Sequence, residues 1–263
     1  MSGDLFVKTE LQDGVLKLVL DRPKVNALNS EMITQIQTAF KAAERNAQVR
    51  CVLLSASGNT FCAGQDLSEM QAKGNVSYRA HLLGTYNPLI LQIRRLEKPV
   101  LAAIQGAVTG AGLGLVLACD LRIAGQEAQF RVGFSGIGLA PDSAVSVLLP
   151  LLIGLGRASE AAFANFPIRA DQALSWGLVN RVVPQSELDY RALEWAKQLA
   201  LGPTHAFGLT KREFNKAILS NLEALLDYEA QNQEIAGRHG EHREGLQAFL
   251  EKRTPDFKTV QGS

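Results

Sequence analysis

The sequence predicts an α/β protein with a helical C-terminal region. Two apolar, strand-like runs, 49–54 and 100–104, are each followed by a turn rich in glycine and alanine. The second turn passes into an apolar run with the character of a helix. Beyond Pro184 the pattern becomes almost wholly helical. We therefore expect a core over residues 1–185 and a helical C-terminal subdomain over residues 186–263.

Local patterns predict the individual elements. Asp13-Gly14 lies between two strand-like runs and is a strong hairpin signal, and Asn29 precedes an apolar run of helical spacing as an N-cap would. The polar segment 69–77 is expected to be mobile. We expect strands at 6–10, 15–20, 51–55, 100–104, 121–124, 129–132 and 179–183, and helices at 32–46, 78–96 (interrupted near Pro88), 113–121, 142–153, 159–165 and 170–176.

Composition excludes several classes of partner. The chain of 263 residues is 46% hydrophobic, enough for a sizeable core. Its net charge of +1, with both signs interspersed, gives no field that would recruit nucleic acid or an anionic membrane. Three cysteines without framework spacing suit reduced thiols, and the N-terminus resembles no signal or transit peptide, so we expect a cytoplasmic protein. His239 and His242 lack a third ligand, so no metal is expected.

Two motifs carry the functional signal. The first is Phe61-Cys62-Ala63-Gly64-Gln65-Asp66-Leu67, and the second runs from Gly106 to Gly114 and on to Cys119-Asp120. Small residues at a strand end leave peptide N–H groups open to a ligand oxygen, and the second motif also begins a helix. Each turn alone could be tight packing. Together they could supply two donors to one oxygen, which is an oxyanion hole.

The two motifs, in this order, resemble those of the crotonase (enoyl-CoA hydratase/isomerase) superfamily. The resemblance extends from Asp21-Arg22-Pro23 to the C-terminal helices. It implies a spiral of ββα turns with a helical tail that completes a homotrimer or a dimer of trimers. It further implies an acyl-CoA thioester as substrate, with CoA as part of that substrate and no other cofactor. The oxyanion donors it implies are the peptide N–H groups of Ala63 and Ala111.

The same resemblance implies a set of CoA-binding and substrate-binding positions. One group lies against the nucleotide, another flanks the entry of the pantetheine arm, and the last belongs to the acyl site. A neighbouring subunit is expected to bring Phe257 and Lys258 to the CoA. The residues expected against the nucleotide are Lys24, Val25 and Ala27. Those expected at the entry of the pantetheine arm are Gln65, Asp66 and Leu67, and those of the acyl site are Gly110 and Phe134.

The reaction type depends on the carboxylates. Hydratases of the superfamily carry two glutamates, and the matching positions here are Gly114 and Phe134. Asp142 instead matches the single acidic residue of the family's isomerases, among them the 1,2-epoxyphenylacetyl-CoA isomerases, which share its Pro-Asp-Ser turn. Ala144-Val145-Ser146 departs from those isomerases, in which a Gly-Gly is usual.

The resemblance implies that Asp142 removes a proton from one acyl carbon and returns it to another, while the oxyanion hole stabilises the dienolate. The outcome would be a double-bond shift or the opening of an epoxide-derived ring, and burial should raise the pKa of this carboxyl. Four alternatives stay open. Asp142 could be only a helix N-cap, and the protein could be hydratase-like, dehalogenase-like with Asp142 as nucleophile, or a non-catalytic acyl-CoA-binding protein.

Overall fold

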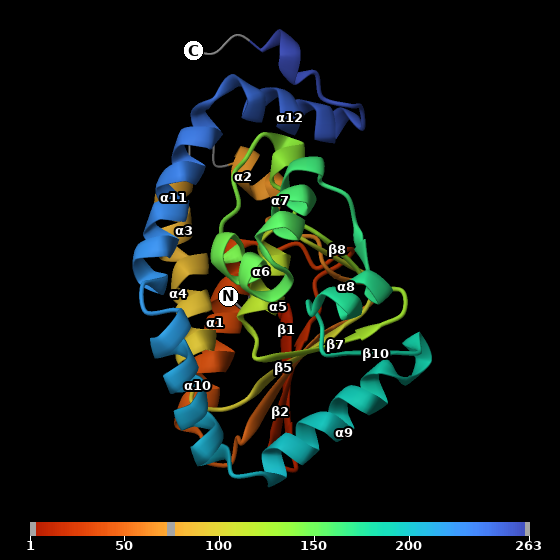
Figure 1. Ribbon diagram of the computed structural model, residues 1–263, viewed down its shortest axis with the longest axis vertical. Coiled ribbons are helices and arrows are strands. Elements are labelled where there is room, and N and C mark those ends of the chain that lie inside the picture. The colour runs from red at the N-terminus through yellow and green to blue at the C-terminus, as the bar shows by residue number, and fades with distance from the viewer. Residues whose placement is uncertain (1–3, 73–76, 261–263) are drawn as a thin grey trace.

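The computed structural model describes residues 4–72 and 77–260 and has two β-sheets surrounded by helices (Figure 1). The larger sheet has six strands in the order β1-β2-β3-β5-β7-β10, and the smaller has four in the order β4-β6-β8-β9. The strands are β1 (Val7–Gln12), β2 (Val15–Leu20), β3 (Cys51–Ala56), β4 (Thr60–Cys62), β5 (Val100–Ile104), β6 (Ala107–Thr109), β7 (Leu121–Gly125), β8 (Gln129–Arg131), β9 (Ile168–Arg169) and β10 (Arg181–Val183).

The chain alternates between the two sheets as it advances. β3, β5 and β7 lie parallel in the larger sheet, and the strands that follow each of them, β4, β6 and β8, lie parallel in the smaller one. Helices follow each of these strand pairs. This repeated strand–strand–helix turn is the predicted spiral. It brings the end of β4 beside the end of β6, so the two sequence motifs become neighbours.

The expected local signals at the N-terminus are confirmed. β1 and β2 pair antiparallel about Asp13 and Gly14, both of which have positive φ as a tight hairpin turn requires. The Asn29 side chain accepts the Met32 N–H at 2.9 Å and caps α1 (Ser30–Arg45). α1 then buries one apolar face in the main core.

Helices cover both faces of the larger sheet. α9 (Leu188–Leu201) packs its alanine-rich side against β3, β5 and β7 and crosses the foot of the molecule in Figure 1. On the other side lie α4 (Tyr86–Arg95), α5 (Ala111–Ala118) and α6 (Val145–Ile153). α10 (Thr204–Ile218) and α11 (Leu222–Arg238) run along α3 (Tyr78–Gly84) and α4, and α12 (Gly240–Glu251) packs on η1 (Ser135–Ile137). The helical C-terminal region is confirmed, and the boundary at residue 185 stays a prediction.

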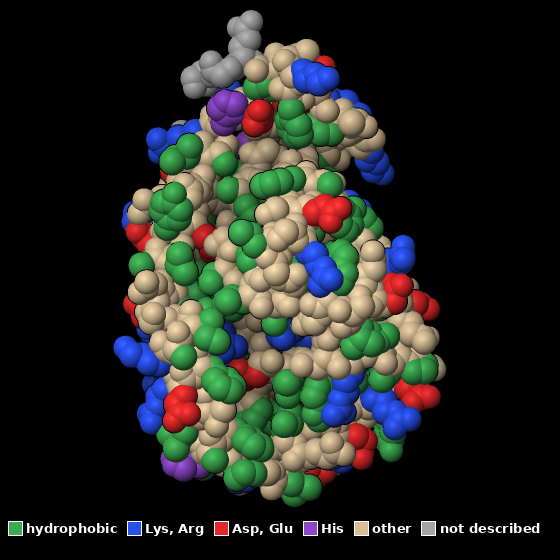
Figure 2. Space-filling model, in the orientation of Figure 1, with side chains coloured by type: hydrophobic (Ala, Val, Ile, Leu, Met, Phe, Trp, Pro, Cys, Tyr) green, Lys and Arg blue, Asp and Glu red, His purple; other side chains and the backbone are tan. Residues whose placement is uncertain are grey.

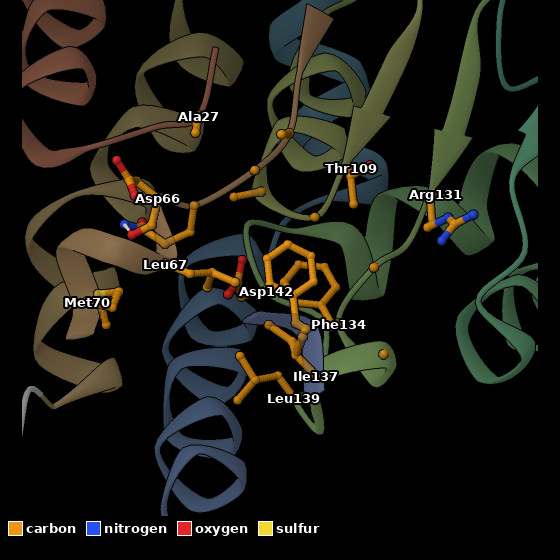
Figure 3. Close-up of a pocket in the computed structure, with 18 of the residues that line it drawn as sticks. Ala27, Asp66, Leu67, Met70, Thr109, Arg131, Phe134, Ile137, Leu139 and Asp142 are labelled. Carbon is orange, nitrogen blue, oxygen red and sulfur yellow. Dashed lines mark hydrogen bonds between the residues drawn. The ribbon is translucent and has the colours of Figure 1, made fainter. Parts of the chain in front are cut away.

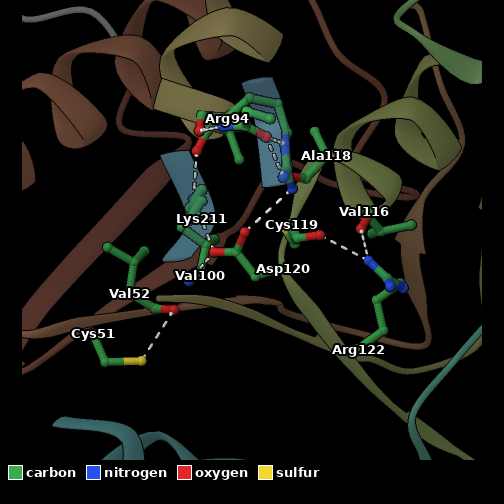
Figure 4. Close-up of polar contacts among 12 residues, drawn as sticks. Cys51, Val52, Arg94, Val100, Val116, Ala118, Cys119, Asp120, Arg122 and Lys211 are labelled. Carbon is green, nitrogen blue, oxygen red and sulfur yellow. Dashed lines mark hydrogen bonds and ion pairs between the residues drawn. The ribbon is translucent and has the colours of Figure 1, made fainter. Parts of the chain in front are cut away.

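α5 is held in place at its C-terminal end by buried polar contacts (Figure 4). The buried guanidinium of Arg122 donates to Cys119 O at 2.8 Å and to Leu178 O at 2.7 Å. Asp120, directly after α5, accepts from Lys211 Nζ of α10 at 2.8 Å and from Arg94 Nη1 of α4 at 3.2 Å. These contacts join α4, α5 and α10 and so fix the helix whose first residue, Ala111, belongs to the second motif.

Several element bounds differ from those predicted. The short strands β4, β6 and β9 were not predicted, because a run of two or three residues carries no measurable periodicity. The predicted helix 142–153 begins only at Val145, and the predicted helix 159–165 is α7 (Leu155–Ala164). Part of the segment expected to be mobile forms α2 (Leu67–Ala72), α8 (Ala170–Trp176) is as predicted, and residues 73–76 lie outside the described part of the chain.

The structure also gives information on membrane-spanning helices, cysteines and metal-ligand clusters. None of the helices in residues 4–72 and 77–260 is long and apolar enough to cross a membrane. Cys51, Cys62 and Cys119 are free and buried. Within the same described ranges, no cluster of three or more His, Cys, Asp or Glu side chains could hold a metal ion.

Candidate active site

A cavity of about 720 Å³ opens where the two motifs meet η1, α3 and the C-terminal helices (Figure 3). Its wall is mainly apolar and aromatic and is interrupted by a few polar side chains. The residues that line it include Val25, Ala27, Ala63, Gly64, Gln65, Asp66, Leu67, Met70, Tyr78, His81, Leu82, Tyr86, Thr109, Gly110, Ala111, Phe134, Ile137, Leu139, Asp142, Gln233, Phe249 and Leu250. All of the site residues predicted within one subunit, except Lys24, are therefore brought to one cavity. Lys24 is exposed and lies outside this lining.

The turn after β4 corrects the predicted pair of backbone donors. The Ala63 N–H donates to Val25 O at 3.0 Å, so it is not free to bind a ligand oxygen. Among the described residues, neither the Gln65 N–H nor the Ala111 N–H donates to a protein acceptor, and both residues line the cavity. Ala111 begins α5, where helix N–H groups lack intrahelical partners. The donor pair that the geometry offers is thus Gln65 and Ala111.

Close approach of the two turns depends on Gly64. Its φ is +89°, and a Cβ placed on it would lie 2.9 Å from Thr109 O and 3.5 Å from the Ala111 N. A side chain at residue 64 would therefore separate the two turns and is also disfavoured by the backbone conformation. This contact is the physical reason for the glycine in the first motif.

The side chain of Gln65 is oriented by two aromatic residues that the sequence reading did not place in the site. The Tyr86 hydroxyl donates to Gln65 Oε1 at 2.6 Å, and His81 Nε2 lies 2.9 Å from the same oxygen. His81 and Tyr86 both line the cavity. No local sequence pattern indicates this shared contact, because residues 81 and 86 are five positions apart and belong to two different helices. These contacts fix the turn that carries the free Gln65 N–H.

Asp142 is a buried carboxylate in the cavity wall, with 6% of its surface exposed. Burial raises its pKa to about 6, although hydrogen bonds from Ser143 Oγ and Gln233 Nε2, each at 2.7 Å, favour the ionised form. The N-cap interpretation is wrong. The cap position of α6 belongs to Ala144, and the Asp142 side chain accepts these two side-chain donors instead of a helix N–H.

The second carboxylate of the cavity, Asp66, is in a different electrostatic state. Its Oδ2 forms an ion pair with Arg22 Nη2 at 2.6 Å, and its Oδ1 accepts from Ser68 Oγ. Burial alone would raise the pKa of Asp66, but the hydrogen bonds from Ser68 and Arg22 outweigh it and lower the pKa below its usual value. A carboxylate held ionised by a cation is a weak base, so Asp142 is the better proton acceptor.

The backbone at Ser143 occupies the space beside Gly114. A Cβ on Gly114 would lie 2.5 Å from Ser143 Cβ and 2.6 Å from Ser143 O. Any side chain at position 114 would therefore displace the loop that carries Asp142. The position at which the resemblance places a hydratase glutamate is closed by Ser143 in this structure.

One further polar pair closes the cavity toward α12. The Tyr78 hydroxyl lies 2.6 Å from His242 Nε2, and His242 Nδ1 lies 2.8 Å from Ile137 O. Because a carbonyl can only accept, Nδ1 carries the proton and Nε2 accepts from Tyr78. Burial lowers the pKa of His242 and raises that of Tyr78 to about 12. His242 was considered only as a metal-ligand candidate, but it fastens α12 to η1.

Comparison with solved structures defines the class. A crystal structure titled as an enoyl-CoA hydratase from Mycobacterium avium subsp. paratuberculosis K-10 superposes with a TM-score of 0.87 at 32% sequence identity, covering 96% of this chain and 98% of that one. The chain thus has the crotonase fold. The family model described as enoyl-CoA hydratase/isomerase matches residues 10–260, so the chain belongs to the enoyl-CoA hydratase/isomerase family and is an enzyme of that family.

Similar sequences are named for different reactions. The chain is 39% identical to a 1,2-epoxyphenylacetyl-CoA isomerase of Escherichia coli (strain K12) over 258 residues, which are 96% of this chain and 98% of the relative. It is 34% identical to 4-chlorobenzoyl coenzyme A dehalogenase-2 of Arthrobacter sp over 255 residues, 95% of this chain and 92% of the relative. The family is therefore established, and the reaction has to be argued from the site.

Proposed function

We propose that this enzyme is an acyl-CoA isomerase in which Asp142 is the proton-transferring base. The peptide N–H groups of Gln65 and Ala111 bind the thioester oxygen. Asp142 takes a proton from one carbon of the acyl group, and the electron pair of that C–H bond moves onto the thioester as a dienolate. The same carboxyl then returns the proton to a second carbon, so the double bond shifts and no atom is gained or lost.

The observation that carries this proposal is a buried carboxylate, Asp142, that lines the same cavity as two free backbone donors. The pKa of Asp142, raised to about 6 by burial, lies close to the operating pH, where a general base works best. Preorganised N–H donors at a developing oxyanion are each worth about 3–4 kcal/mol of barrier. Together these parts suit enolisation of a thioester.

Hydration by a glutamate pair needs a second carboxylate to activate water, and the cavity favours isomerisation on this ground. Asp66 and Asp142 are the carboxylates among the described residues that line it, and Asp66 is neutralised by Arg22. Phe134 and the closed space at Gly114 occupy the positions of the hydratase glutamates. One proton carrier is sufficient for a 1,3-shift.

The cavity wall also suggests the kind of acyl group. Tyr78, Tyr86, Phe134 and Phe249 contribute aromatic surface, with Leu139 and neighbouring aliphatic side chains between them. Such a wall favours an apolar or ring-bearing acyl group. We propose the epoxide-derived ring of an epoxyphenylacetyl-CoA, or a 3-enoyl-CoA, as the substrate class, and the similarity to a 1,2-epoxyphenylacetyl-CoA isomerase supports this choice.

Assay of a CoA-thioester panel tests the reaction type. With 3-enoyl-CoA, epoxyphenylacetyl-CoA, crotonyl-CoA and 4-chlorobenzoyl-CoA, we expect isomerisation of one of the first two. Hydration of crotonyl-CoA should be at least about tenfold slower, a difference of about 1.4 kcal/mol in barrier. Faster hydration, or chloride release from the fourth compound as the dominant reaction, would overturn the isomerase assignment. No turnover with any of the four would favour a binding protein.

The pH dependence follows from the raised pKa of Asp142. The base must be ionised, so kcat/KM should be constant above about pH 7 and fall about tenfold per unit below about pH 6 as the carboxyl takes up a proton. The affinity for an unreactive acyl-CoA, measured over the same range, controls for titration of the CoA phosphate. A kcat/KM that stays constant down to pH 4 would contradict a base with this pKa.

We also propose that the enzyme assembles as a homotrimer or a dimer of trimers and acts in the cytoplasm. Hydrophobic side chains lie exposed over α6, α7, α10 and α11 on the face shown in Figure 2. Phe163 of α7 and Ile235 of α11 are 82% and 69% exposed. Apolar surface of this kind is available for contact with another subunit. The proposed approach of Phe257 and Lys258 to a neighbouring subunit's CoA belongs to this assembly.

A further inference from the structure

α11 presents two buried polar side chains to the loop that carries Asp142. Glu229 and Gln233 lie one helical turn apart, so they share a face, and they are 4% and 1% exposed. Neither residue belongs to the two sequence motifs, and Glu229 does not line the cavity. Both side chains contact the loop 140–146, which leads from η1 into the first turn of α6.

Four hydrogen bonds connect these side chains to the loop. Gln233 Oε1 accepts the Ala140 N–H at 3.1 Å, and Gln233 Nε2 donates to Asp142 Oδ2 at 2.7 Å. Glu229 Oε2 accepts the Ala144 N–H at 2.8 Å, and its Oε1 accepts the Ser146 N–H at 3.1 Å. The contacts lie on both sides of Asp142, so α11 binds the loop before and after the carboxylate.

The loop needs these contacts because its backbone conformation is unfavourable. Ser143 and Ala144 have φ values of +55° and +64°, a region that costs an L-residue about 1–2 kcal/mol. Conformations of this kind persist only where the surroundings determine them in more than one way. The Glu229 carboxylate binds the N–H of Ala144, one of the two strained residues, and the N–H of Ser146 in the first turn of α6.

Glu229 is itself expensive to bury. Among the described residues no Lys or Arg pairs with it, and burial raises its pKa to about 7, with the negative charge of Asp142 adding to this effect. A buried carboxylate without a cation is costly unless it is fully hydrogen-bonded. The two backbone donors and the positive end of α6 offset that cost. An apolar side chain at position 229 would avoid the free-energy cost of burying a carboxylate. The presence of Glu229 there therefore indicates a role in placing the loop.

We propose that Glu229 and Gln233 are positioning residues that hold loop 140–146 in the one conformation that aims the Asp142 carboxylate into the cavity. The inference rests on the proposed function, because it assigns these side chains to the same proton transfer. Neither residue supplies a proton or binds the thioester oxygen. Their effect on the reaction is exerted through the position of Asp142.

Three variants test the proposal: Glu229→Gln, Gln233→Leu and the double variant. Each single change should lower kcat about 10-fold to 100-fold, since a displacement of about 1 Å at a reacting group can cost about 10²-fold. KM should change less than about twofold, because the free donors at Gln65 and Ala111 are untouched. The double variant should be less impaired than the product of the single effects, since both side chains act on one loop.

Glu223→Gln is the matched control, the same change on the same helix at an exposed side chain. A lowered Tm with unaltered kcat per folded molecule, in either single variant, would mean a structural role only and overturn the inference. If Glu229→Gln does not fold, Gln233→Leu tests the inference by itself. A lowered kcat with a nearly unchanged KM is again the expected result. Loss of turnover in Asp142→Asn with full turnover in these variants would reject the positioning role and keep the proposed function, whereas full turnover in Asp142→Asn would reject both.

Discussion

Replacing Asp142 by Asn is expected to lower isomerase turnover at least about 100-fold, the lower end of what a general base contributes. Asn has the same shape but cannot accept a proton at neutral pH. Its Oδ1 can still accept from Gln233 Nε2, and its Nδ2 can donate to Ser143 Oγ, whose hydroxyl is free to rotate. The fold and the acyl-CoA affinity should therefore be preserved. Steady-state rate, ligand affinity and Tm, measured on this variant, separate chemistry from structure.

Asp66→Asn is the informative comparison, because it alters the second carboxylate of the same cavity. Its pair with Arg22 holds the turn that carries the Gln65 N–H, so we expect a raised KM with most of the turnover retained. Unaltered turnover in Asp142→Asn would leave the cavity without a base and remove the isomerase mechanism. A larger loss of turnover in Asp66→Asn than in Asp142→Asn would move the base to residue 66.

The second large effect is on stability, at Asp120. Asp120→Ala should lower the free energy of unfolding by about 3–5 kcal/mol, because it leaves the ammonium of Lys211 and the guanidinium of Arg94 without their carboxylate. Lys211 is 7% exposed and cannot regain water without moving α10. The Val100 N–H also loses its acceptor. For a chain of this size the expected decrease in Tm is roughly 6–20 °C.

A double variant that also removes the buried positive charge tests whether the loss of stability is electrostatic. Adding Lys211→Met to Asp120→Ala should restore part of the lost stability, because the buried cation is then gone as well. Asp189→Ala, on the exposed side of α9, should change Tm little. If the double variant is less stable than Asp120→Ala, the cost lies in packing and the electrostatic account of this network is wrong.

Much of the framework could be predicted because its signals are local. The hairpin at Asp13-Gly14, the cap at Asn29 and the continuous apolar run 100–104 each depend on neighbouring residues alone. The Pro88 interruption was also predicted, although the break between α3 and α4 falls at Thr85 and Pro88 lies in the first turn of α4, which accepts proline. Interactions between residues close in the chain determine these features, so they can be predicted from the sequence.

The missed features of the site depend on distant residues. The Ala63 N–H is occupied by Val25, which lies 38 positions earlier (63 − 25) and whose carbonyl has no sequence signal. Pro-Asp-Ser was read as a helix start, but the left-handed backbone of Ser143 and Ala144 is stabilised by Glu229, a residue of α11. The sequence predicted which residues gather at the cavity. It could not predict which backbone donors remain free, because that depends on long-range pairing.

The contact between Gly114 and Ser143 has an evolutionary consequence. Because Ser143 fills the space that a glutamate at position 114 would need, the substitution Gly114→Glu is expected to be harmful until the loop 140–146 has been remodelled. Remodelling the loop first would misplace Asp142, the proposed base, and so abolish the proposed isomerase activity. The two changes are thus epistatic, and each alone passes through a poorly active intermediate. If such an isomerase is to become a hydratase, gene duplication, with one copy relieved of selection, offers an easier route than stepwise substitution in a single copy.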